Sequence, residues 1–314
     1  MRKILFSAML MFAFASPLFS QQVDFSAELR PRFEYKNGFK SLLKTGEEGA
    51  SFISQRTRLN LNYLQDNFKV RIALQNVRVW GDVSTLSAND NSNSFHEAWA
   101  QFSIDKDFYI KFGRQEIVYD DSRIFGNVGW AQQARSHDAI VAKVKLSKTG
   151  KLDVGFALNN DSQGGIKTIY SNVAGYKTFQ YAWYHTQMSN FGISFLALNN
   201  GVEFVDVNTD IKLNYSQTFG SRITYKKNSL SFNAATYFQT GKVLTNSVSA
   251  NYFTANASLK ATSEFNFGIG FEYLSGKDTN DVSTEIKSFN PIFGTNHKFN
   301  GWMDYFYVGN HANS

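Results

Sequence analysis

The sequence predicts an all-β protein, an antiparallel transmembrane β-barrel of which about 13 or 14 strands are present. Three observations predict it. Apolar and polar side chains alternate over long runs, many of these runs have ten or more residues, and short connections alternate with long ones. A tilted strand needs about 9–11 residues to cross a bilayer, and barrels of the bacterial outer membrane have short turns at one end and longer loops at the other.

The alternation is clear near the start of the chain. Between residues 24 and 35, apolar side chains such as Phe25 and Phe33 occupy odd positions, and charged side chains such as Glu28 and Arg32 occupy even positions. This period of two gives a strand one apolar and one polar face. The pattern recurs at 53–63, 68–74, 152–158 and 265–273. Breaks of parity at Asn76-Val77 and after Gly113 predict bulges.

A soluble β-sandwich would show the same alternation, with its apolar faces turned inward. The length of the runs favours the barrel, because strands of globular proteins usually have about 5–6 residues. The alternation of short and long connections also favours it, because it is typical of outer-membrane barrels. Short turns are expected at 65–67, 105–107, 148–150, 189–190, 226–229 and 261–264, and longer polar loops near 36–51, 81–94, 119–136, 160–176, 200–209 and 276–298. The link near 240–244 is short where a long loop is expected.

Residues 1–20 have the layout of a secretory signal peptide, and residues 21–314 form the barrel domain. Arg2 and Lys3 precede an apolar run over 4–15, which ends at Ser16-Pro17. A transmembrane helix is the competing interpretation, but it needs about 20 apolar residues. The strand pattern begins soon after residue 20, which argues against a separate plug domain.

Composition excludes several classes of protein. Without Arg2 and Lys3 the chain has 30 basic and 26 acidic residues, a net charge of +4, which is too small to indicate nucleic-acid binding. The absence of cysteine excludes thiol catalysis, iron–sulfur clusters and cysteine-based zinc sites. The five histidines show no metal-ligand spacing, and His137-Asp138 would point to opposite faces of a strand. No cofactor is expected.

The polar faces of the predicted strands are rich in cations. In a barrel these faces line the lumen, where rows of cations attract and orient anions. Internal salt bridges that brace the wall are the alternative interpretation, and the two roles are compatible. The cations are Arg30, Arg32, Arg56, Arg58, Lys69, Arg71, Lys143 and Lys145.

A denser set of charges lies between residues 113 and 138. It begins with Gly113-Arg114-Gln115-Glu116 and continues with Tyr119-Asp120-Asp121-Ser122-Arg123 and Trp130-Ala131-Gln132-Gln133-Ala134-Arg135. This mixture of opposite charges predicts a long loop that folds inward and is held by ion pairs. A calcium site at Asp120-Asp121 is a weaker hypothesis, because adjacent carboxylates alone are poor evidence for a metal.

These motifs resemble the alginate export family of outer-membrane porins. The stretches from Phe289 to Phe299 and from Gly301 to Phe306 resemble members from Bacteroidetes-type bacteria. The resemblance implies a monomeric barrel of about eighteen strands in outer-membrane lipid. It also implies a basic constriction, at Arg114, Arg123 and Arg135, that passes an acidic polysaccharide. A truncated C-terminus and a periplasmic export partner are further expectations.

The preferred hypothesis is therefore a passive outer-membrane channel for anionic solutes, including an acidic polysaccharide such as alginate. Its candidate site residues are Arg30, Arg32, Arg56, Arg58, Arg71, Arg114, Arg123 and Arg135. An outer-membrane enzyme of the lipase or protease type is one alternative, and it requires a Ser–His or Asp–His pair within hydrogen-bond distance. A structural or adhesive barrel with a plugged lumen is the other.

Overall fold

The computed structural model describes residues 21–38, 41–90, 92–170, 175–299 and 301. The predicted signal peptide and the last predicted strand, from 302 onward, lie outside these residues. Within them, no helix is both long and apolar enough to cross a bilayer.

Fourteen strands form one antiparallel sheet in which each strand pairs with its neighbours in sequence, apart from the short β12, which pairs only with β11. The strands are β1 (Gln21–Lys36), β2 (Ala50–Gln65), β3 (Phe68–Val79), β4 (Asn93–Asp105), β5 (Phe108–Gln115), β6 (His137–Lys145), β7 (Lys151–Leu158), β8 (Thr178–Met188), β9 (Phe191–Val205), β10 (Ile211–Lys227), β11 (Leu230–Val243), β12 (Asn246–Ser247), β13 (Ala250–Lys260) and β14 (Asn266–Leu274). A short 3-10 helix, η1 (Asn296–Lys298), follows.

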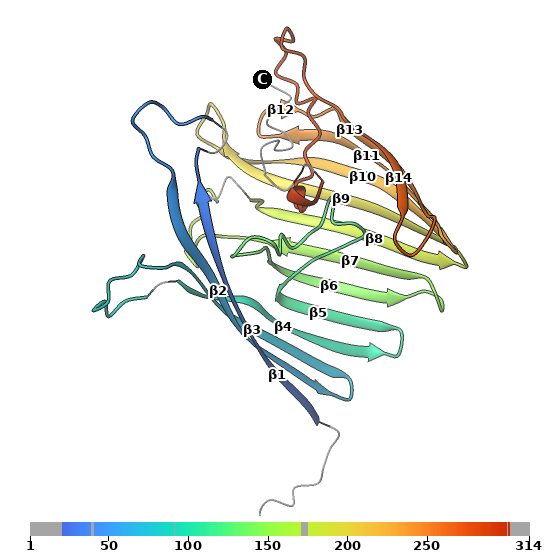
Figure 1. The fold of residues 1–314 in the computed structure, drawn as a ribbon, viewed down its shortest axis with the longest axis horizontal. Helices are drawn as coiled ribbons and strands as arrows, with labels where there is room; N and C mark the ends of the chain where they lie inside the picture. Colours follow the sequence, from blue (N-terminus) through green and yellow to red (C-terminus); the bar gives the residue numbers. More distant parts are fainter. Residues whose placement is uncertain (1–20, 39–40, 91, 171–174, 300, 302–314) are drawn as a thin grey trace, which may run out of the picture.

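The sheet is strongly curved, and β1 and β14 are its two end strands (Figure 1). The β5–β6 connection and η1 lie on its concave side. The predicted all-β antiparallel architecture is confirmed.

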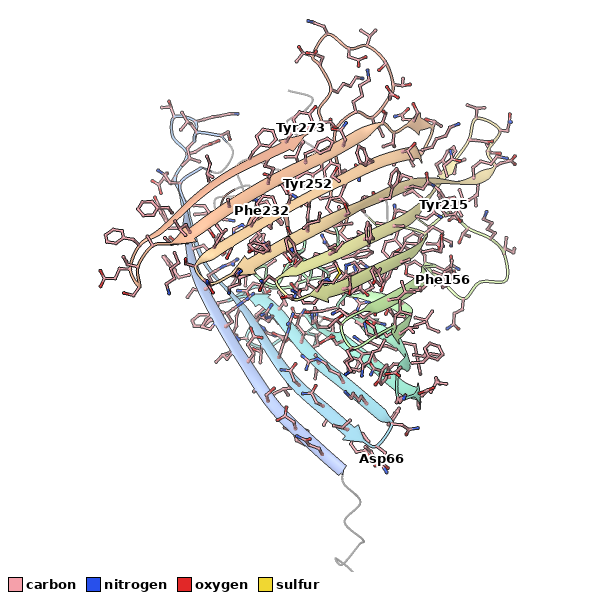
Figure 2. The ribbon with its side chains drawn as sticks, turned by 90° about the vertical axis from the view of Figure 1, so that its right-hand side faces the viewer. Asp66, Phe156, Tyr215, Phe232, Tyr252 and Tyr273 are labelled. Carbon is pink, nitrogen blue, oxygen red and sulfur yellow. The ribbon has the colours of Figure 1, made fainter. Side chains whose placement is uncertain are left out.

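The convex face is apolar and exposed. Phe267, Ile269 and Phe271 on β14 are 64%, 79% and 63% exposed, and Phe25 on β1 is 76% exposed. Figure 2 looks onto this face. Side chains of this kind belong in lipid. The face is therefore not the dry interior of a sandwich, as the alternative would require.

The connections sort as predicted, with one correction. The turns at 66–67, 106–107, 189–190 and 228–229 are two residues long and lie at the same end of the sheet, on the right-hand side of Figure 1. The loop expected over 200–209 is shorter, because β9 continues to Val205 and leaves only 206–210. Pairing with β8 and β10 keeps Asn199 to Gly201 in the ladder despite their turn-forming composition.

The predicted bulges were wrong in position. The β3–β4 register shifts between Ala73 and Leu74, where His96 on β4 is the extra residue. Beyond Gly113, β5 stays in register with β6. Gly113 has φ +109, and a Cβ there would lie 2.4 Å from the Ala98 carbonyl oxygen, so glycine allows the close approach of β4 without a shift of register.

Candidate constriction site

The β5–β6 connection, residues 116–136, extends across the concave side of the sheet, and we call it the inner loop. Its contacts run from Arg30 on β1 to Glu272 on β14, the two end strands. The sequence prediction of an inward loop held in part by ion pairs is confirmed.

One flank of the inner loop is held by aromatic packing. Phe125 is 1% exposed, and its ring lies 4.9 Å from Tyr181 and 5.9 Å from Phe179 of β8. Tyr119 stacks on Trp183 at 4.4 Å and donates a hydrogen bond to Asp153 on β7. Burial is the largest cause that raises the pKa of Tyr119 well above its usual value, so this hydroxyl remains a donor.

A distant segment, residues 288–299, completes this flank. Phe293 forms a parallel bridge with Phe125 and also packs on Phe179, 5.5 Å away. Gly126 donates a backbone hydrogen bond to Phe293, and Thr295 donates one to Ser122. The inner loop is therefore continued by a second strip of chain from beyond β14.

The opposite flank is held by arginines that bind backbone carbonyls. Arg30 donates to the carbonyl oxygens of Gly129 and Ala131, both at 2.9 Å, and to the Gln132 side chain at 3.1 Å. Arg56 donates to the carbonyl oxygens of Ala131 and Gln132 at 3.3 and 3.4 Å. We call Arg30, Arg56 and these acceptors the arginine clamp.

The other predicted arginines of β1–β3 also lie on the concave face. Arg32 forms an ion pair with Glu34 at 2.8 Å, and 39% of its side chain is exposed. Arg58 is buried and donates to Gln75 at 2.7 Å, while its Nη2 has no partner among the described residues. Arg71 forms an ion pair with Glu97 on β4. These residues include internal salt bridges, as the bracing interpretation required.

Arg123 is the most buried of the predicted residues, at 1% exposure. It forms an ion pair with Glu272 and lies between the rings of Tyr252 and Phe299, 4.6 and 3.9 Å from their centres. Its side chain joins the inner loop to β13, β14 and the 288–299 segment. In this position it braces the loop and is not open to solvent.

The remaining two family-motif arginines differ from each other. Arg135 donates to the carbonyl oxygens of Gly126 and Gly294, which links the inner loop to the 288–299 segment. Arg114 pairs with Asp138 and shares the convex face with the exposed Ile140. The structure therefore gives no support to a channel-lining position for Arg114. The expectation for Arg114 rested on the family resemblance and not on the alternation of the strand.

Asp120 and Asp121 are committed to protein partners. Asp120 accepts hydrogen bonds from Trp183 and Ser194, and Asp121 pairs with Arg222 at 3.2 Å. No group of three or more His, Asp or Glu residues in the described part of the chain is arranged to hold a metal ion. These partners account for both carboxylates without calcium.

Glu116 holds the start of the inner loop to the bulge on β4. Its carboxylate contacts His96 at 2.7 Å and accepts a hydrogen bond from Asn127 at 2.7 Å. Burial, the largest single influence, opposes ionisation, but these hydrogen bonds outweigh it and lower the pKa of Glu116. The residue is therefore a carboxylate at neutral pH.

A Ser–His pair does lie within hydrogen-bond distance, so that criterion alone does not dismiss an enzyme. Ser194 and His185 are 3.0 Å apart, and the Ser194 hydroxyl donates to Asp120 at 2.6 Å. In a catalytic triad the histidine lies between serine and carboxylate and takes the serine proton. Here serine is in the middle and its hydroxyl proton is donated to the carboxylate and not to the histidine, so this pair offers no activated nucleophile. His137 and Asp138 lie on opposite faces, as predicted.

Sequence reasoning missed the acceptors of the arginine clamp and the aromatic flank. The available signal was a set of apolar side chains in a segment without alternation, namely Phe289, Ile292 and Phe293. Apolar side chains in an otherwise polar loop indicate burial. Nothing in the sequence indicated that backbone carbonyls of 129–132 would face Arg30 and Arg56.

Comparison with known proteins agrees with this architecture. A sequence model of the family described as alginate export matches residues 21–312. No curated protein shows a significant match. The solved structures that it resembles include the outer membrane protein OpdK of Pseudomonas aeruginosa, with TM-score 0.54, 10% identity and coverage of 82% of this chain and 67% of that one.

Two further structures give the same picture. OpdL of Pseudomonas aeruginosa has TM-score 0.53 and 12% identity, over 88% of this chain and 70% of that one. OmpF of Salmonella typhi, solved in complex with daunomycin, has TM-score 0.51 and 13% identity, over 86% of this chain and 82% of that one. At these identities the likeness establishes the fold.

Proposed function

This chain belongs to the alginate export family of outer-membrane channels, and on that premise we propose that it passes anionic solutes, such as an acidic polysaccharide of the alginate type, through a constriction formed by the inner loop and the arginine clamp. The observation that carries the proposal is the way in which the clamp arginines are bound. Their partners on the inner loop are neutral carbonyl oxygens.

Neutral acceptors satisfy the N–H groups of a guanidinium but leave its charge uncompensated. Arg30 and Arg56 lie directly opposite each other on β1 and β2, and Glu28 offsets only one charge through its ion pair with Arg56. Arg58, next along β2, adds a further charge on the same face. The side of the constriction at β1–β2 is thus net positive, which favours anions and disfavours cations.

The mechanism we propose is electrostatic. Fixed cations at the constriction offset the loss of water from a carboxylate, and several cations side by side allow the solute to move from one to the next. Arg32, with 39% of its side chain exposed, is the arginine of this group most open to a passing solute. No covalent step is involved.

The test is ion selectivity in planar bilayers. We expect wild-type protein to prefer chloride over potassium, and Arg56→Gln with Arg58→Gln to shift the reversal potential toward cation preference. Arg78→Gln with Lys227→Gln removes the same charge away from the inner loop and is the matched control. Unchanged anion preference in the Arg56 and Arg58 variant, or a cation-selective wild type, would refute the proposal. Absence of conductance would favour the plugged structural barrel.

Three companion proposals concern the whole protein. Residues 1–20 direct export and are removed, which mass spectrometry of the mature N-terminus tests. The barrel acts as a monomer, which light scattering in detergent tests. A periplasmic partner delivers the solute, which crosslinking in cells tests.

A further inference from the structure

A cavity apart from the constriction lies between the sheet and the segment that follows β14. It measures about 270 Å³, and its walls are formed by β9, β10 and β11 on one side and by residues 286–292 on the other. None of its lining residues belongs to the inner loop or to the arginine clamp. Asn200 and Ser216 line it from the halves of β9 and β10 that are remote from the short turns. In the outer-membrane layout this end faces outward.

Hydrogen bonds hold the two walls of the cavity together. Ile286 donates a backbone hydrogen bond to Ser247 at 2.8 Å, and Ser249 donates one to Ile286 at 2.9 Å. The Gln239 side chain donates to the carbonyl oxygen of Asn290 at 2.6 Å and accepts from the N–H of the same residue at 2.9 Å. The cavity is therefore preformed, as small-molecule sites usually are.

The lining of the cavity is uncharged. No ionisable side chain is found among the described residues that line it, although charged side chains are frequent elsewhere on the concave face. Half of the lining side chains are aliphatic, namely Val202, Val243, Leu244, Val248, Ile286 and Ile292. An ion that entered would lose water without gaining an opposite charge. The lining thus favours an uncharged ligand with an apolar body.

Two polar side chains on the wall lack partners. Asn200 and Ser216 are directly opposite each other in the β9–β10 register, and each is 4% exposed. The Asn200 Oδ1 and Ser216 Oγ atoms have no hydrogen-bond partner among the described residues. Buried polar groups are nearly always hydrogen-bonded, and one without a partner opposes folding. Two such groups side by side at one cavity indicate that a ligand supplies their partners.

We propose that this cavity binds a small uncharged ligand that has an aliphatic body and adjacent hydroxyl groups, which hydrogen-bond to Asn200 and Ser216. A hydroxyl both donates and accepts, so it can donate to the amide oxygen and accept from the serine. Side chains directly opposite each other in a sheet lie about 5 Å apart at Cβ, so neighbouring hydroxyls of one ligand can reach both. The inference is independent of the proposed function, because no charged group of the constriction takes part.

The experiment measures binding of vicinal cis-cyclohexanediol to the full chain in nanodiscs by saturation-transfer NMR, with empty nanodiscs to correct for uptake by lipid. Cyclohexanecarboxylate, which has the same ring but a charge, is the ligand control and is expected to bind at least about tenfold more weakly. Asn200→Leu with Ser216→Ala is expected to weaken binding of the diol about tenfold or more, because it removes both hydrogen bonds. Asn256→Leu with Ser231→Ala makes the same changes on the concave face near the short turns, and it should change affinity less than about threefold.

The urea midpoint separates loss of the site from loss of folding. Asn200→Leu with Ser216→Ala should raise the midpoint of the ligand-free protein in lipid vesicles, because apolar groups replace polar atoms without partners. A lower midpoint would show that the two side chains stabilise the fold, and it would overturn the proposal. Binding of the diol no stronger than to empty nanodiscs, equal binding of the carboxylate, or equal weakening in the two double variants would overturn it as well.

Discussion

The two flanks of the inner loop are attached by different chemistry. On β7 and β8, and through the 288–299 segment, buried rings such as Phe125 and Phe179 pack together, and little of the contact is ionic. On β1 and β2, Arg30 and Arg56 bind carbonyl oxygens at the edge of the polar interior. Apolar burial is not directional but contributes a large free energy, so it fixes the position of the loop. Hydrogen bonds contribute less net free energy but are directional, so they fix the orientation of the loop. The aromatic flank should therefore govern stability and the arginine flank selectivity.

The largest effect is expected from the aromatic flank. Phe125→Ala should lower the free energy of unfolding by about 3–5 kcal/mol, because the ring is buried and its removal leaves a cavity. Urea unfolding of the protein in lipid vesicles, followed by tryptophan fluorescence, measures this. Phe125→Leu should cost much less. If the alanine variant unfolds like wild type, the loop is not anchored here.

Next in size is the buried ion pair at the far end of the loop. Glu272→Gln should destabilise the protein by about 3 kcal/mol, because it removes the ion-pair partner of the buried Arg123 guanidinium. The same unfolding assay measures it. Glu264→Gln, in an exposed turn, is the control. If the free energy of unfolding falls by nearly the same amount in the two variants, the ion pair between Arg123 and Glu272 does not stabilise the protein.

A smaller effect is expected from the arginine clamp. Arg30→Gln should loosen the tip of the inner loop by about 2 kcal/mol, since hydrogen bonds from charged donors contribute roughly 1.5–3 kcal/mol. Global unfolding should hardly change. Limited proteolysis within 129–133 should accelerate about 30-fold, as that free energy implies. Arg78→Gln, whose partner is Asp90, should leave the cleavage rate unaltered.

The smallest expected effect is a dependence of the protein's stability on pH, which comes from the polar contacts of Glu116. The pKa of Glu116 is lower in the folded chain than its ordinary value of 4.5, so its contribution to stability is complete above pH 4.5 and declines as the pH falls through the folded-state pKa. Glu116→Gln should remove that part of the acid sensitivity in unfolding midpoints measured from pH 7 to pH 3. Parallel curves for wild type and variant would contradict it.

The fold was predictable because its main signal is local. Alternation at 24–35 or 265–273 is a property of neighbouring residues and does not depend on distant contacts. The inward loop was predictable from its mixed charges. The partners of its ends were not, because Phe125 and Phe293 are 168 positions apart and meet through the curvature of the whole sheet. Arg114 shows the remaining weakness, since a role carried over from a family motif does not fix the face of the sheet on which the side chain lies.

The register of the first hairpin has a consequence for the order of biogenesis. Arg30 and Arg56 face each other as soon as β1 and β2 pair, yet the carbonyl groups that receive them belong to residues 129–132, which are synthesised later. Before the β5–β6 connection packs against the hairpin, the two guanidinium groups repel each other. Glu28, which pairs with Arg56, is the nearest carboxylate that offsets their charge. The N-terminal hairpin is thus expected to mature late, after insertion of the central strands, even though it emerges first from the ribosome.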